Sequence, residues 1–139
     1  MYNQRKEIRK HFTQMTEKEM MIVKDKIDKS VNGDVKSVNI VHHALENFIK
    51  RTPQRKEYKW MMARALTNFT PIEFKRIYSG VNLVEERSLL RGTDIVNGES
   101  FVMVYSITNR KIITLWVNAL EDMHSTLDMN LYDSNMEIY

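Results

Sequence analysis

Apolar residues in the first half of the chain recur every three or four positions, the spacing that puts side chains on one face of an α-helix. The clearest run follows Thr16 and comprises Met20, Val23, Ile27 and Val31. Thr16 and Glu19 have the spacing of a capping box, in which each side chain accepts a hydrogen bond from the other residue's backbone N–H. A helix is therefore predicted from Thr16 to the stop signal Asn32-Gly33.

Four further segments are expected to be helical. Residues 4–11 lack an apolar stripe and are expected to form a short polar helix, and HHALENFIKR predicts a helix after a β-branched strand at residues 35–41. Thr52-Pro53 and Thr70-Pro71 each place an N-cap residue before a proline at the first helical position. The first pair predicts a helix, and the second predicts a two-turn helix ending at Gly80. The buried face expected for the former comprises Tyr58, Met61, Met62, Ala65 and Leu66.

After Gly80 the apolar period changes to two, which indicates strands. Expected strands span residues 87–96, 99–108 and 111–117, with Asn97-Gly98 as a type I′ hairpin signal between the first two. The fold class is therefore α+β, with N-terminal helices packed on a three- to four-stranded antiparallel meander. All 139 residues are expected to form one domain, in which a helical region at 1–34 precedes an α+β core at 35–139.

The register of the last hairpin predicts which residues share a face. If Asn109-Arg110 is a two-residue loop, Met103 faces Trp116 and Tyr105 faces Thr114. The opposite face is aliphatic and suits helix packing; it holds Val102, Val104, Ile113, Leu115 and Val117. The mixed face is where a site is expected; it holds Phe101, Tyr105, Thr114 and Trp116.

Composition and charge restrict the class of protein. The chain is 42% hydrophobic and 28% charged, which is ordinary for a soluble globular protein, and it has no apolar run long enough to span a bilayer. The absence of cysteine excludes disulfides and thiolate chemistry and is compatible with the cytoplasm. Residues 1–60 carry 14 Lys or Arg against 8 Asp or Glu, whereas residues 61–139 carry 7 against 10. A basic first half points mildly to a polyanionic partner.

Three groups of residues are candidates for chemistry. His42-His43 is one, because imidazole titrates near neutrality, although a histidine at a helix start also serves as a backbone partner. The second is a basic cluster interleaved with Tyr58 and Trp60, and it fits either RNA binding or a solvated helix face. This cluster comprises Lys50, Arg51, Arg55, Lys56 and Lys59.

The third group combines Arg87 and Arg91 with Thr114, Trp116 and His124. Arginine holds phosphate bidentately and stabilises the charge of a phosphoryl transition state, so these residues fit RNA cleavage. They equally fit a pairing of Arg87 with neighbouring glutamates and simple packing of Trp116. No ligand spacing indicates a metal site, no phosphate-binding loop is present, and no cofactor is expected.

Three segments together carry a family resemblance: VNIVHHALENFIKR, TPIEFKRIYSGVNLVEERSLLRG and KIITLWVNALEDMHSTLDMNLYD. They resemble small phage and mobile-element domains of the barnase–colicin–RelE-like ribonuclease and toxin superfamily, over residues 35–132. The resemblance implies metal-independent RNA cleavage, with His43, Arg91, Thr114 and His124 as catalytic candidates. The basic cluster and Trp116 would then contact RNA.

An alternative of another class remains open, because members of such families also act only by binding. Five acidic residues and no basic one follow Leu120, and methionine is frequent. An acidic segment can imitate nucleic acid and occupy a basic channel of another protein. The alternative function is therefore a phage-type, non-catalytic protein that binds and inhibits or redirects a host protein such as a nucleic-acid enzyme. Neither function requires a membrane.

Overall fold

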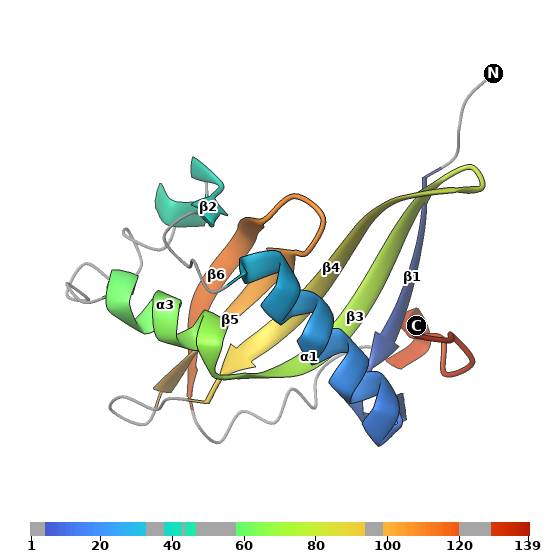
Figure 1. Ribbon diagram of the computed structural model, residues 1–139, viewed down its shortest axis with the longest axis horizontal. Helices are drawn as coiled ribbons and strands as arrows, with labels where there is room; N and C mark the ends of the chain where they lie inside the picture. Colours follow the sequence, from blue (N-terminus) through green and yellow to red (C-terminus); the bar gives the residue numbers. More distant parts are fainter. Residues whose placement is uncertain (1–4, 33–37, 43, 47–57, 94–98, 120–128) are drawn as a thin grey trace.

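The computed structural model describes residues 5–32, 38–42, 44–46, 58–93, 99–119 and 129–139. Within them the chain forms one sheet and a few helices (Figure 1). The helical elements are η1 (Phe12–Gln14), α1 (Glu17–Val31), α3 (Tyr58–Thr67) and η3 (Met129–Leu131). The strands are β1 (Arg5–His11), β2 (Asn39–Ile40), β3 (Phe69–Ser79), β4 (Asn82–Gly92), β5 (Glu99–Ser106) and β6 (Lys111–Ala119).

The sheet has six strands in the order β1-β3-β4-β5-β6-β2. Neighbours from β1 to β6 pair antiparallel, whereas β2 pairs parallel with β6. The α+β class is confirmed, but the sheet is larger than the predicted meander and is mixed. The chain visits both edges before it builds the four central strands. Strand β1 comes from a segment predicted to be helical, whereas β2 lies within the strand predicted at residues 35–41.

Helices α1 and α3 lie on the same face of the sheet, and both contribute side chains to the core there (Figure 1). The predicted apolar stripe of α1 is confirmed at Val23, Ile27 and Val31, which are buried against side chains of β3, β4, β5 and β6. The sheet residues of this core include Phe74, Leu90, Met103, Tyr105, Ile112 and Leu115. We call this side the core face of the sheet and the side turned away from α1 the outer face.

The predicted capping box of α1 is present in full. The Glu19 backbone N–H donates to Thr16 Oγ1 at 3.1 Å, and the Thr16 backbone N–H donates to Glu19 Oε1 at 3.0 Å. Asn32 ends the helix in the left-handed region at φ 54°. Asparagine tolerates that region because its short polar side chain bonds locally. Local hydrogen bonding therefore fixes both ends of this helix.

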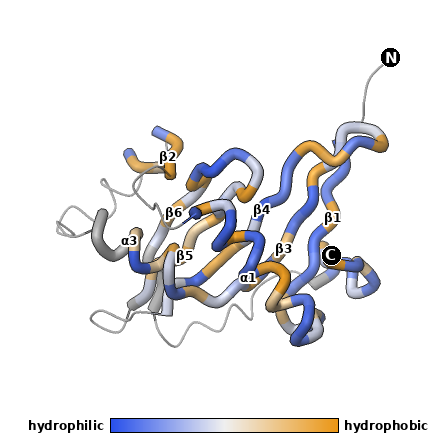
Figure 2. The backbone as a smooth tube through the Cα atoms, in the orientation of Figure 1, coloured by the Kyte–Doolittle hydropathy of each residue, from blue (hydrophilic) through white to orange (hydrophobic). Residues whose placement is uncertain are grey.

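Two predicted helices are wrong, because both segments are strands. Residues 5–11 form β1, which pairs along its length with β3 and is largely hydrophilic (Figure 2). The segment from Thr70 to Gly80 was predicted as a helix from its proline and capping pattern, but it runs through β3. There it pairs with β1 on one side and β4 on the other, and a register shift follows Pro71. Pairing on both sides outweighs the local helix-start signal.

The register predicted for β5 and β6 is also wrong. A bulge between Val104 and Tyr105 brings Tyr105 opposite Ile112 and Trp116 opposite Val102. Phe101 and Tyr105 consequently lie in the α1 core, whereas Val102 and Val104 pack with Trp116 on the outer face. The predicted strand at 87–96 lies earlier in the chain, at residues 82–92. No helix among the described residues is long and apolar enough to cross a membrane.

The C-terminal segment from Tyr132 to Tyr139, called the strap below, crosses the edge of the sheet beside β1 (Figure 1). The Asp133 backbone N–H donates to the carbonyl of Arg9 at 2.8 Å. Further along, Met136 and Ile138 are buried in the α1 core. Tyr132 anchors this end of the chain through its hydrogen bond to Glu73, whereas the neighbouring Leu131 is exposed.

Candidate functional site

Three cations from distant parts of the sequence stand side by side on the outer face. Arg9 of β1 is the cross-strand partner of Lys75 of β3, which is in turn the partner of Arg87 of β4. Directly paired residues in antiparallel strands project their side chains on the same side, about 5 Å apart. Like charges so arranged repel one another unless carboxylates or a bound anion compensate them. We call Arg9, Lys75 and Arg87 the cation row.

Glu7 compensates the row at its β1 end. Its carboxylate accepts hydrogen bonds from Arg5 and Arg9, each at 2.9 Å, and lies 3.5 Å from Lys75 Nζ. Burial raises the pKa of Glu7, but the charge of Lys75 and the bonds from Arg5 and Arg9 outweigh it and hold the pKa below its usual value. One ionised carboxylate is therefore shared among three cations, which leaves this corner positively charged.

Glu85 compensates the row at its β4 end. Arg87 Nε and Nη2 donate to the two oxygens of Glu85 at 2.8 and 3.0 Å, and Ser106 Oγ donates to the same carboxylate at 2.7 Å. Burial again opposes ionisation, yet the bonds from Arg87 and Ser106 lower the pKa of Glu85. This two-point contact fixes the plane of the Arg87 guanidinium, which is the geometry that also suits phosphate.

A pocket of about 170 Å³ lies next to the row on the outer face. Its charged lining consists of the cation row and Glu73, and its apolar lining consists of Leu89, Val104 and Trp116. Pockets for drug-sized ligands are about 300–1,000 Å³, so this one fits a single ring-sized group. The pocket thus joins an apolar surface with an aromatic ring to a set of cations.

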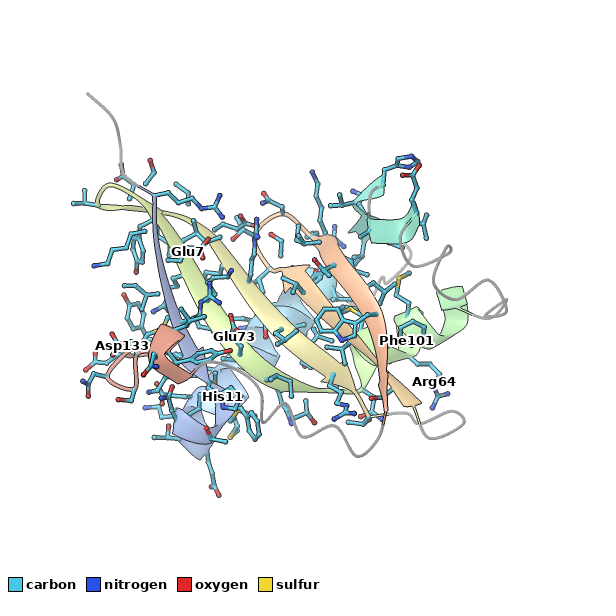
Figure 3. All side chains as sticks on the ribbon, turned by 180° about the vertical axis from the view of Figure 1, so that it is seen from behind. Glu7, His11, Arg64, Glu73, Phe101 and Asp133 are labelled. Atoms are coloured by element: carbon cyan, nitrogen blue, oxygen red, sulfur yellow. The ribbon has the colours of Figure 1, made fainter. Side chains whose placement is uncertain are left out.

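Glu73 receives a hydrogen bond from the strap. The Tyr132 hydroxyl donates to Glu73 Oε2 at 2.8 Å, and the other carboxylate oxygen lies 3.7 Å from Arg9 Nη1. Burial, the hydrogen bond to Glu73 and the charge of Glu73 raise the pKa of Tyr132 well above its usual value. The phenol is therefore protonated at neutral pH and acts as a donor. Figure 3 shows Glu73 and His11 at this end of the sheet, with Asp133 at its edge.

His11 adjoins this contact but is turned into the structure. It is 5% exposed, its ring packs edge-on against Tyr132 with centroids 5.2 Å apart, and Nδ1 lies 2.8 Å from Thr13 Oγ1. The ring also caps η1 by accepting from the Thr13 backbone N–H. Its burial and local bonds assign His11 to holding the end of β1.

The predicted residues Arg91, Thr114 and Trp116 fall on the outer face. Arg91 pairs with Val102, which pairs with Trp116, and Thr114 pairs with Val104. Trp116 and Val104 both line the pocket. Arg91 Nε donates to Ser100 Oγ at 2.7 Å. Three of the predicted site residues therefore share one surface with the cation row, although the predicted register that grouped two of them was wrong.

Of the remaining predicted residues, the structure describes a side chain only for His42. His43, His124, Lys50, Arg51, Arg55 and Lys56 lie outside the described residues, and of Lys59 only the backbone, in α3, is described. His42 is exposed on the surface and contacts Glu46 at 2.8 Å. No group of three histidine, aspartate or glutamate side chains with metal-binding geometry occurs within the described residues.

Sequence reasoning missed Arg9, Glu73 and Lys75, which line the pocket, and Tyr132, which contacts it. A signal existed for the first three, because charges alternate with period two in Arg5-x-Glu7-x-Arg9 and in Glu73-x-Lys75. That period is typical of strands with one polar face. Nothing in the sequence indicated that these segments are neighbours.

The fold and the site together define an α+β protein with a mixed six-stranded sheet, one face of which is covered by α1 and the other of which carries a charged, partly aromatic pocket. No protein-family model, no curated protein and no solved structure matches the chain. Its function is therefore inferred from the site alone.

Proposed function

We propose that the protein binds RNA in single-stranded form on the outer face of its sheet. The observation that carries the proposal is the adjacency of the cation row to a pocket with an apolar lining and the Trp116 ring. Single-stranded nucleic acid offers phosphates and unstacked bases at short intervals, and proteins hold it with cations and aromatic faces. A surface with only one of these features would fit other ligands equally well.

Each part of the surface has a counterpart in the ligand. A phosphate binds Lys75 and Arg87 in competition with the carboxylates of Glu7 and Glu85. The pocket takes one base against Trp116. Glu73 accepts a hydrogen bond from a base or ribose donor. Arg91 and Thr114 extend the surface along β4 and β6, so the strand of RNA continues past the pocket.

The finer proposal is metal-independent endonucleolytic cleavage. In that reaction the ribose 2′-oxygen loses its proton to a base and attacks the phosphorus, the bond to the 5′-oxygen breaks, and that oxygen takes up a proton. Glu73 is a carboxylate beside the cation row, suited to accept the first proton, while Lys75 and Arg87 stabilise the charge on the phosphoryl oxygens. We propose His43 or His124, which the family resemblance implies as catalytic residues, as the source of the second proton.

Binding to a host protein through an acidic C-terminal segment is less well supported. Among the described residues of that segment, Met136 and Ile138 are buried in the core of the domain. These two side chains pack within the protein itself and are not exposed to a partner protein. The described part of the chain thus favours RNA over a partner that recognises a detached acidic tail.

Fluorescence anisotropy with a labelled single-stranded RNA of mixed sequence tests the binding. Lys75→Gln and Arg87→Gln are each expected to weaken binding about tenfold at low salt, because each removes a phosphate contact. Lys29→Gln is the matched control: it removes an equal charge from α1, where the Lys29 side chain is 78% exposed and pairs with Asp25. Equal affinity of all four proteins, or no binding by the wild type, would overturn the proposal.

Cleavage is tested separately on the same RNA in the presence of a chelator. The wild type is expected to yield 2′,3′-cyclic phosphate ends, and Glu73→Gln is expected to reduce the rate at least a hundredfold while the protein still binds RNA. Binding without cleavage by the pure wild type would reject the ribonuclease and retain the RNA-binding protein.

A further inference from the structure

The strap links the two faces of the sheet. Tyr132 contacts Glu73 on the outer face, Asp133 bonds to the edge of β1, and Met136 and Ile138 enter the core on the α1 side. Because the strap begins at the candidate site and ends in the core, a change in how its end packs in the core can shift the position of Tyr132 at that site.

Buried charges hold the strap on the α1 side. Lys10 Nζ donates to the carbonyl of Met136 at 2.8 Å, and the Ile138 backbone N–H donates to Glu19 Oε2 at 3.1 Å. Arg76 Nη1 and Nη2 donate to the carbonyls of Glu137 and Tyr139 at 2.8 and 3.1 Å. Four hydrogen bonds to charged groups, together with two buried apolar side chains, fix the position of the strap.

At the other end, Tyr132 determines which partners Glu73 has. The phenol occupies Glu73 Oε2 at 2.8 Å, while the nearest nitrogen of Arg9 is 3.7 Å from Oε1, beyond hydrogen-bond length. Arg9 Nη2 is instead directed to Glu7 at 2.9 Å. Without the phenol both Glu73 oxygens would be open acceptors beside the Arg9 guanidinium, and a two-point Arg–carboxylate pair is the favoured geometry for such neighbours.

We propose that Tyr132 is a positioning residue of the RNA site: its hydroxyl keeps Glu73 from closing on Arg9, and docking of the strap keeps Tyr132 in place. Arg9 Nη1 thereby stays available to a phosphate, while Nη2 donates to Glu7. This inference rests on the proposed RNA-binding function and specifies how Arg9 of the cation row is kept able to bind phosphate. It also predicts that a perturbation on the α1 side of the sheet changes affinity on the outer face.

A double-mutant cycle on RNA affinity provides the test. Tyr132→Phe is expected to weaken binding three- to tenfold, on the order of one lost cation–phosphate contact. Glu73→Gln is expected to tighten RNA binding about threefold, because it removes a negative charge beside the cation row. In the Glu73→Gln background, Tyr132→Phe should have no further effect, since no carboxylate remains to close on Arg9. Tyr139→Phe is the matched control in the same strap, where the tyrosine is 76% exposed.

The strap arm of the test uses Ile138→Ala, with circular dichroism to establish that the variant is folded. It is expected to weaken RNA binding as Tyr132→Phe does, and the two changes together should weaken it no more than either alone. Additive losses, or a Tyr132→Phe protein that binds as the wild type does, would overturn the inference and leave the proposed function standing.

A second measurement does not involve RNA. Rotation about the Nε–Cζ bond of Arg9, followed by NMR of the guanidinium nitrogens, is expected to slow in Tyr132→Phe as the pair with Glu73 forms. An unchanged rotation rate of the Arg9 guanidinium in Tyr132→Phe contradicts the inference, whether or not the wild type binds RNA. Failure of the wild type to bind RNA would instead reject the proposed function.

Discussion

Lys10→Met is expected to be among the most destabilising single substitutions in this protein. Lys10 and Glu19 are 6% and 9% exposed, and the Lys10 amine donates to both carboxylate oxygens at 2.9 and 3.0 Å and to the carbonyl of Met136. Methionine keeps the length of the stem and removes the charge. The substitution therefore leaves the Glu19 carboxylate buried without its cation.

The magnitude follows from the cost of an unpaired buried charge. Removing one partner of a buried ion pair costs about 3–5 kcal/mol, against a total free energy of unfolding of about 5–15 kcal/mol for a domain. A neutral amide at position 19 removes the buried charge and keeps one oxygen, which accepts from the backbone N–H of either Thr16 or Ile138 but not of both. Lys10→Met combined with Glu19→Gln is thus expected to recover at least about 1 kcal/mol of the loss.

Urea denaturation followed by circular dichroism measures these differences. The control is Lys29→Met, which breaks an ion pair with Asp25 of similar length, 2.9 Å, on the exposed side of α1. It is expected to cost less than about 0.5 kcal/mol, because water already screens that pair. A Lys10→Met protein within about 1 kcal/mol of the wild type, or a double variant less stable than the single one, would refute the reasoning.

Three further predictions concern stability. Burial raises the pKa of Glu19, but the hydrogen bonds from Lys10 and the backbone outweigh it and lower the pKa overall. The stability that ionised Glu19 contributes is therefore present above pH 4.5 and is lost as pH falls through the depressed pKa. The urea midpoint should consequently drop in acid more steeply in the wild type than in a Glu19→Gln variant. Gly92→Ala would place a Cβ 2.8 Å from that of Ala65 in α3, and a thermal melt should show a loss of about 1–3 kcal/mol. Tyr105→Phe removes a partly buried 2.8 Å hydrogen bond to Ser30 and should cost about 1 kcal/mol by urea denaturation. An unchanged midpoint in any of these cases contradicts the energetic role given to the corresponding contact.

The parts of the fold that depend on local hydrogen bonds could be predicted from the sequence. The capping box at Thr16 and Glu19 and the stop at Asn32 identified α1 and its inward face, because all the groups involved lie within a few residues of one another. The segment from Thr70 to Gly80 carries similar signals and is nevertheless a strand. There, pairing with β1 and β4 replaces the intrahelical bonds that Thr70 and Glu73 would have started.

The site depends on pairings that the sequence does not encode locally. Arg9 and Lys75 are neighbours only because β1 pairs with β3 across a separation of more than sixty residues. The bulge beside Val104 moved Trp116 opposite Val102, which a two-residue turn model could not anticipate. Residue types could therefore nominate Arg91, Thr114 and Trp116, whereas their joint position with the cation row required the sheet.

An NMR titration with a single-stranded RNA tests the location of binding most directly. The outer-face pocket is lined by Lys75, Arg87 and Trp116, among others. We expect the amide signals of Lys75 and Arg87 and the indole N–H signal of Trp116 to shift together and to saturate as RNA is added. Amides of Val23 and Ile27, buried on the opposite side of the sheet, are expected to stay unchanged. Shifts confined to α1, or a spectrum unaltered by RNA, would contradict binding at the outer face.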